Sequence, residues 1–188
     1  WSTKANMIAQ AKFMRGVCYY VLYSFYGGVP LRLTPSDRES LAVSRATRQQ
    51  TIDQIIKDWT DAAVDLDETS SLASNKPTAP NKYSAYAYLA KLYWVMGCNS
   101  WAAENGDYWA TGVLKQTWPE MQASNVYFKK AKEYGDLVLD KSDFDLESDF
   151  NTLYNGTRLS FSKEFVFVID ATKNTTENVG YNSLHWTF

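Results

Sequence analysis

The chain offers few of the side chains from which enzymes build catalytic centres. His185 is the only histidine among the 188 residues, and it lies near the C-terminus, a poor place to orient a general base. A Ser-His-Asp or Cys-His system is therefore disfavoured. Together with two cysteines, one histidine is too few for a metal site built on His and Cys. Cys18 and Cys98 each fall within an apolar helical pattern, which favours buried free thiols over a disulfide.

Carboxylates are numerous but their spacing does not define a site. The acidic cluster comprises Asp140, Asp143, Asp145, Glu147 and Asp149. It fails the EF-hand pattern because Ser148 occupies the position of the required glycine. Apolar residues alternate with the acids, so an extended, solvated segment whose apolar side docks on helices is the favoured interpretation. A glycosidase needs only two carboxylates, and the 21 acidic residues do not exclude one, although no pair is identified.

The segment 98–121 carries most of the chain's unexplained chemistry. It contains Trp101, Tyr108, Trp109 and Trp118 in a stretch without a helical apolar pattern. One interpretation is that the segment folds back and buries its own rings. The other is a ligand platform, in which flat rings stack on the apolar faces of sugars while neighbouring side chains, Asn105 among them, hydrogen-bond hydroxyl groups. The sequence predicts candidate ligand-binding residues here: Trp101, Trp109, Trp118, Tyr108 and Asn105.

Composition narrows the class of protein. Hydrophobic residues make up 45% of the chain, which is enough for a sizeable core. The net charge is -2 and no dense Lys/Arg block occurs, so nucleic acid and anionic membrane surfaces are disfavoured as main partners. No apolar run is long enough to span a bilayer. The N-terminus shows no initiator Met, signal peptide or lipid-attachment cysteine, and we expect the chain to be a piece of a longer protein.

Four segments show helical periodicity. The first spans about 3–26, with a predicted buried face of Met7, Ala11, Met14, Cys18, Val21, Leu22 and Phe25. It should end at Gly27-Gly28, with Pro30 blocking continuation. The second follows a capping box that begins at Thr47, and its apolar face is Ile52, Ile55, Ile56, Trp59, Ala62, Ala63 and Leu66.

The third helix follows Pro80 and should end at Gly97, and the fourth spans about 124–140. The residues 164–169 are rich enough in β-branched and aromatic side chains to predict a strand. The expected fold is mainly α: two helical hairpins stacked as in tetratricopeptide repeats, forming one core over 1–188 with a short appended strand. The segment 98–121 would be an aromatic-rich insert in this core.

The order of motifs resembles the SusD/RagB family of Bacteroidetes. "AKFMRGVCYYVLYSFYGGVPL" is similar to the family's first long helix and following turn, with Arg15 at its arginine position. "SRATRQQTIDQIIKDWTDAAVDL" resembles the next helix, with Arg45, Thr47 and Asp58 in place. "YSAYAYLAKLYWVMG", "FKKAKEYGDLVLD", "FDLESDFNTLYNG" and "KEFVFVID" follow in family order.

The resemblance implies a non-enzymatic, lipid-anchored protein of the outer membrane surface that needs no cofactor. Such a protein captures an oligosaccharide or another nutrient and delivers it to a SusC-like TonB-dependent transporter. The resemblance covers the tetratricopeptide-like core, without the lipidated N-terminus and the C-terminal half of complete members. A helical-repeat adaptor that binds proteins and no sugar remains the alternative, because Trp and Tyr also dominate protein interfaces.

Overall fold

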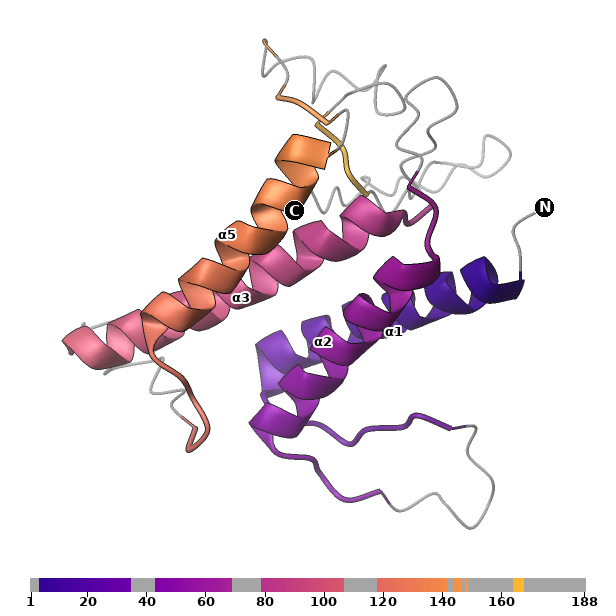
Figure 1. The fold of residues 1–188 in the computed structure, drawn as a ribbon. Coiled ribbons are helices and arrows are strands. Elements are labelled where there is room, and N and C mark those ends of the chain that lie inside the picture. Colours follow the sequence, from indigo (N-terminus) through magenta and orange to yellow (C-terminus); the bar gives the residue numbers. More distant parts are fainter. Residues whose placement is uncertain are drawn as a thin grey trace, which may run out of the picture.

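The computed structural model describes residues 4–34, 43–68, 79–106, 118–141, 144–146, 148 and 164–167. These residues contain four helices, α1 (Lys4–Tyr26), α2 (Arg48–Asp65), α3 (Lys82–Asn105) and α5 (Ser124–Lys141). Figure 1 shows two antiparallel pairs: α1 lies beside α2, and α3 lies beside α5. Helix α2 also packs against α3, which joins the pairs. The predicted mainly helical, hairpin-based fold is confirmed. None of the helices in these ranges is long and apolar enough to cross a membrane.

Helix α2 begins at the predicted capping box. The side chain of Thr47 accepts a hydrogen bond from the backbone N–H of Gln50 at 3.1 Å. The side chain of Gln50 in turn accepts from the backbone N–H of Thr47 at 2.8 Å. Two backbone donors that the helix itself cannot satisfy are thereby paired, which fixes where α2 starts.

The glycine pair ends α1, as predicted. Gly27 has φ +70° and its N–H donates to the carbonyl of Tyr23, which closes the last turn in the left-handed conformation. A Cβ at Gly28 would lie 2.2 Å from the carbonyl oxygen of Ala46, so the chain before α2 passes too close for any side chain there. The pair therefore turns the chain and lets the loop segment 43–47 approach it.

Two arginines tie α1 to α2 and to the loop that precedes it. Arg15 donates to both carboxylate oxygens of Asp58, at 2.8 and 2.6 Å, and the Asp58 side chain is buried. Arg45 donates to the carbonyl oxygens of Gly28 and Tyr26. A bidentate pair of this kind fixes the register of the two helices.

The core lies between the helices and is rich in aromatic rings. Phe13 and Trp59 each meet the ring of Tyr88 edge-on, with centroids 5.3 and 5.1 Å apart. A Cβ at Gly16 would lie 2.5 Å from Trp59 Nε1, so the glycine allows the indole to approach α1. Trp59 Nε1 donates to the carbonyl oxygen of Phe13, which satisfies its polar atom within the core.

The predicted buried face of α1 is wrong. The buried residues are Asn6, Ala9, Phe13, Gly16, Val17, Tyr19, Tyr20 and Tyr23. Met7, Leu22 and Phe25, which were expected inside, are 63%, 41% and 74% exposed. Cys18 is an exposed free thiol rather than a buried one, while Cys98 is free and partly buried. The face of α1 that carries Phe13, Tyr19, Tyr20 and Tyr23 packs into the core with Trp59, so the predicted stripe lies on the outside.

Helix α3 passes through Gly97 instead of ending there. A Cβ at Gly97 would lie 2.7 Å from two ring carbons of Phe128 on α5, so this glycine allows close helix packing. The helix ends eight residues later, where Gly106 adopts φ 63° and caps it in the left-handed conformation. The predicted aromatic segment therefore begins within α3.

The predicted strand at 164–169 is not observed in its described part. Residues 164–167 form a turn and a bend, and residues 168 and 169 lie outside the described ranges. Phe165 and Phe167 are buried, and Phe167 packs edge-on against Phe13 with centroids 5.1 Å apart. The carbonyl oxygen of Val166 accepts from the Ser84 hydroxyl at 3.1 Å. Ring packing and this hydrogen bond hold the segment on α3, where a strand would need a second strand to pair with.

Candidate functional site

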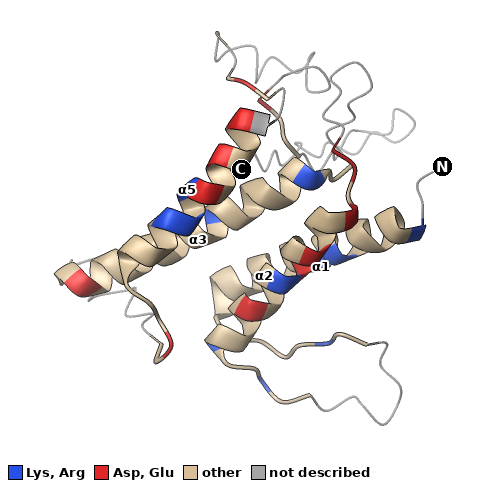
Figure 2. Ribbon diagram, viewed as in Figure 1, with Lys and Arg blue, Asp and Glu red and all other residues tan. Residues whose placement is uncertain are grey.

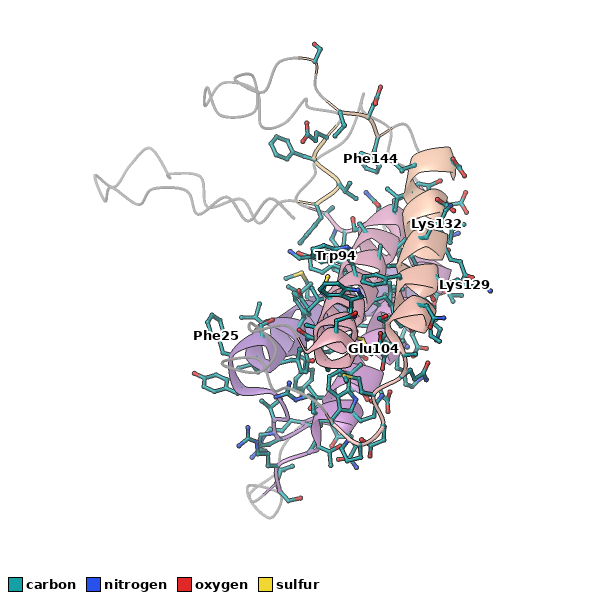
Figure 3. The ribbon with its side chains drawn as sticks, turned by 90° about the vertical axis from the view of Figure 1, so that its left-hand side faces the viewer. Phe25, Trp94, Glu104, Lys129, Lys132 and Phe144 are labelled. Atoms are coloured by element: carbon teal, nitrogen blue, oxygen red, sulfur yellow. The ribbon has the colours of Figure 1, made fainter. Side chains whose placement is uncertain are left out.

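Two exposed tryptophans lie on α3. Trp94 is 58% and Trp101 is 47% exposed. They are seven residues apart, which places them on one side of the helix about 10.5 Å apart along its axis. Figure 3 shows Trp94 on the side of α3 that is turned toward the viewer. We call Trp94 and Trp101 the α3 tryptophan pair; large exposed rings at helical spacing form a surface on which flat apolar groups can stack.

An open groove adjoins Trp94 between α3 and α5. Its volume is about 440 Å³, and it is lined by Ala90, Lys91, Trp94, Phe128, Ala131 and Lys132. The floor is apolar and the two lysines supply hydrogen-bond donors. Burial lowers the pKa of the Lys91 ammonium, and Lys132 pairs with Asp136 at 2.6 Å. The groove thus combines an aromatic wall with donors, as small-molecule sites generally do.

A carboxylate joins the end of α3 to the start of α5. Glu104 accepts from the backbone N–H and the hydroxyl of Ser124, both at 2.7 Å. These bonds hold the pKa of the Glu104 carboxyl below its ordinary value. The Ser100 hydroxyl lies 2.7 Å from the carbonyl oxygen of Gln122 and is buried. This junction fixes the end of α3 that carries Trp101.

Only part of the predicted ligand-binding set lies on this surface. Trp101 does, and Asn105 is the last residue of α3, where its side-chain amide donates to the carbonyl oxygen of Trp101 at 2.8 Å. Trp118 is 7% exposed, its Nε1 donates to Gln49 Oε1 at 2.6 Å, and the Arg48 guanidinium lies over its ring. In this arrangement Trp118 anchors the chain on α2. Tyr108 and Trp109 lie outside the described residues.

Trp94 was missed by the sequence analysis. It sat inside a predicted core helix, and the aromatic segment was taken to start after Gly97. The seven-residue spacing from Trp101 was the signal that could have found it, since two turns of helix return to the same face.

Metal binding finds no support in the described ranges. They contain no group of three or more His, Cys, Asp or Glu side chains able to hold an ion. Asp140 and Asp145 of the acidic cluster are described, whereas Asp143, Glu147 and Asp149 are not. His185 also lies outside the described residues.

The described helices form two stacked hairpins, which is the architecture of a helical-repeat protein, and comparison with known proteins identifies the family. Residues 2–94 match the family model SusD-like_3, described as "Starch-binding associating with outer membrane". The curated SusD-like protein P2 of Formosa agariphila is 28% identical over 173 residues, which cover 89% of this chain and 28% of that protein. The chain belongs to the SusD-like family.

Solved structures share the fold. A SusD-like carbohydrate-binding protein from Bacteroides fragilis matches with a TM-score of 0.65 and 20% identity, over 88% of this chain and 27% of its own. A second SusD-like protein from Bacteroides fragilis gives a TM-score of 0.67 at 16% identity, over 92% and 28%. A laminarin-binding SusD-like protein gives 0.58 at 18%, over 82% and 30%. The chain therefore spans less than a third of the length of these relatives.

Proposed function

We propose that this chain is the helical core of a non-catalytic glycan-binding protein of the outer membrane surface. Membership of a family described as starch-binding and associated with the outer membrane supports the ligand class and the location. The observation in this chain that carries the proposal is the α3 tryptophan pair, because exposed indoles on a rigid helix cost little ordering on binding.

Binding would use stacking and hydrogen bonds without covalent chemistry. Trp101 and Trp94 would each take the apolar face of one sugar ring, about 10.5 Å apart along α3. Lys91 and Lys132 would donate to hydroxyl or carboxylate oxygens in the groove beside Trp94. Because Asn105 adjoins Trp101, we retain it as a hydrogen-bonding candidate.

The segment that follows α3 would complete the platform. Tyr108 and Trp109 stay in the proposed set because of their residue type and because they follow Trp101 closely in the sequence. Trp118 would contribute by anchoring the far end of this segment on α2 through Gln49, and it could stack on a ligand only after leaving that position.

Delivery to a SusC-like TonB-dependent transporter is the proposed role of the whole protein. Retention of the ligand at the cell surface, through a lipid anchor on the complete protein, would serve that transfer. Co-purification of a SusC-like transporter with the complete protein from Bacteroidetes outer membranes tests this partner independently of sugar binding.

Native affinity gels test the ligand class. The complete protein is run in gels that contain neutral or acidic polysaccharides, and retardation is compared for the wild type, Trp101→Ala, Trp94→Ala and the control Tyr26→Ala. Tyr26 is a matched control because it is also an exposed aromatic, 64% exposed, but lies on α1.

We expect at least one polysaccharide to retard the wild type and Tyr26→Ala equally. Each tryptophan change should weaken binding by about five- to thirtyfold, or roughly 1–2 kcal/mol, as for interface aromatics. Retardation that survives both tryptophan changes would reject the site. The protein-binding adaptor is favoured instead if no polysaccharide retards the wild type while another protein is retained.

A further inference from the structure

The groove between α3 and α5 has positive charge on both of its walls. Its charged lining residues are Lys91 on α3 and Lys132 on α5, and no acidic residue is among the described residues that line it. Figure 2 shows basic residues in the middle of α5, while acidic residues gather toward the C-terminal end of that helix. Because the formal net charge of the chain is -2, a basic groove is a local feature of this surface and does not follow from composition.

The two lysines differ in their exposure to water. Lys91 is partly buried, since it also borders a smaller cavity beside Tyr88 and Phe167, and this burial lowers the pKa of its ammonium group. An anion bound next to Lys91 would replace hydration that the ammonium group has already lost, so little further desolvation of Lys91 would oppose binding.

Lys132 is available to a ligand in a different way. Its side chain is 76% exposed, and it pairs with Asp136, one turn further along α5. An exposed ion pair between residues four apart on a helix contributes little to stability. The anionic group of a ligand can therefore compete with Asp136 for the Lys132 ammonium group.

Trp94 places a sugar ring next to these charges. It follows Lys91 by three residues, so the two side chains are neighbours on one face of α3. Figure 3 shows Trp94 and Lys132 on the two neighbouring helices. A sugar that stacks its apolar face on the indole turns the substituents at its ring edge toward the walls that carry the lysines. The groove volume of about 440 Å³ lies within the range of small-molecule sites, roughly 300–1,000 Å³.

The other end of the α3 tryptophan pair has a different charge. Glu104 and Asn105 follow Trp101 by three and four residues, so a carboxylate and an amide adjoin that indole. A carboxylate there repels an anionic sugar, whereas both groups hydrogen-bond hydroxyl groups. Only the Trp94 end therefore has the charge that an anionic sugar requires.

We propose that the groove between α3 and α5 is a subsite for an anionic sugar, whose carboxylate or sulfate group is held by Lys91 and Lys132 while Trp94 stacks on its ring. The inference rests on the proposed glycan-binding function and adds the charge of the ligand to it. Lys91 and Lys132 are then the residues that determine specificity for acidic polysaccharides.

Matched polysaccharides separate charge from shape. Native affinity gels of the complete protein contain polygalacturonate or alginate, each compared with its methyl ester, or carrageenan or chondroitin sulfate, each compared with its desulfated form. The first two probes test a carboxylate and the last two test a sulfate. We expect at least one charged polysaccharide to bind the wild type at least about tenfold more tightly than its neutralised form.

Substitutions of lysine by glutamine test the two residues. Lys91→Gln should weaken binding of the charged polysaccharide by about tenfold, and Lys132→Gln by about threefold, because Lys132 is more exposed. Both variants should keep the wild-type affinity for the neutralised form, and Lys91→Arg should retain most of the binding. Lys129→Gln is the matched control, because Lys129 is an exposed lysine of α5 outside the groove lining, and its removal changes the net charge equally.

A gain of affinity provides a second readout that a misfolded variant could not give. Asp136→Asn removes the carboxylate that competes for Lys132, and it should strengthen binding of the charged polysaccharide by about twofold. Weaker binding by this variant would contradict the role of Lys132.

The outcomes distinguish this inference from the proposed function. Equal binding of charged and neutralised forms by the wild type, or retardation by neutral polysaccharides alone, would overturn the anionic subsite and leave glycan binding intact. Equal losses in Lys91→Gln and Lys129→Gln would also overturn it, because the effect would then follow from net charge. Failure of every polysaccharide, neutral or acidic, to retard the wild type would overturn the proposed function and the subsite together.

Discussion

Substituting Gly97 by Ala tests the close contact between α3 and α5. The new Cβ would lie 2.7 Å from two ring carbons of Phe128 and 3.1 Å from a third. Glycine to alanine inside a helix gains about 1 kcal/mol from backbone entropy. Overpacking against a ring held between α3 and α5 costs about 1–3 kcal/mol. The net effect on the free energy of unfolding should be a loss of up to about 2 kcal/mol.

Gly135→Ala is the control because that glycine is also inside a helix and its Cβ would meet nothing within 4 Å. It should stabilise the protein by about 0.5–1 kcal/mol. The helix-propensity gain cancels between the two variants, so the difference between their urea unfolding free energies, about 1–3 kcal/mol, measures the contact with Phe128.

Adding Phe128→Leu to Gly97→Ala should recover part of the loss, because a smaller side chain leaves room for the methyl group. The reasoning is refuted if Gly97→Ala stabilises the protein as much as Gly135→Ala. In that case α3 and α5 would not pack as described, and the groove beside Trp94 would lose its floor.

Two further changes test how the helices begin and join. Thr47→Ala should lower the free energy of unfolding by about 1 kcal/mol, because the capping box of α2 loses its side-chain acceptor. Thr47→Ser retains a hydroxyl group and should keep most of the wild-type stability. Urea unfolding followed by circular dichroism measures both variants. The pKa of Glu104 is lowered in the folded protein because Ser124 donates hydrogen bonds to its carboxylate. The stability that Glu104 contributes is therefore present above the ordinary glutamate pKa and is lost as the pH falls through the lowered pKa of the folded state. The melting temperature should therefore fall less steeply on acidification in Glu104→Gln than in the wild type, and identical pH profiles would contradict this role.

Local signals in the sequence predicted local structure well. The Thr47 capping box and the Gly27-Gly28 stop depend on a few neighbouring residues, and both appear as predicted. The buried face of α2 was also predicted correctly. Charged residues cover the other side of this helix, so only one face is apolar enough to be buried. Periodicity is decisive when only one face of a helix is apolar.

The errors come from residues whose role depends on the rest of the fold. On α1 both faces are apolar, so the sequence could not say which one Trp59 would meet. Gly97 has the composition of a helix stop, but its role is set by Phe128 on another helix. Phe165 and Phe167 have strand-like composition, but both are buried, and Phe167 packs on the rings of Phe13 and Tyr88.

The candidate site was only partly predictable for the same reason. The composition of segment 98–121 pointed to Trp101, which is exposed, and equally to Trp118, whose indole is bound to Gln49. Only the position of α2 distinguishes these two tryptophans. Trp94 was overlooked because the helix was expected to end at Gly97. With that end point, Trp94 and Trp101 would not lie on the same helix and could not share a face.

A structure of the complete protein with a bound oligosaccharide tests the central claim most directly. We predict that a sugar ring lies flat on the indole of Trp101, with atoms within about 4 Å of its face, and that the chain of sugars continues toward Trp94. An oligosaccharide bound elsewhere, with both indoles of the α3 tryptophan pair covered by protein, would contradict the account.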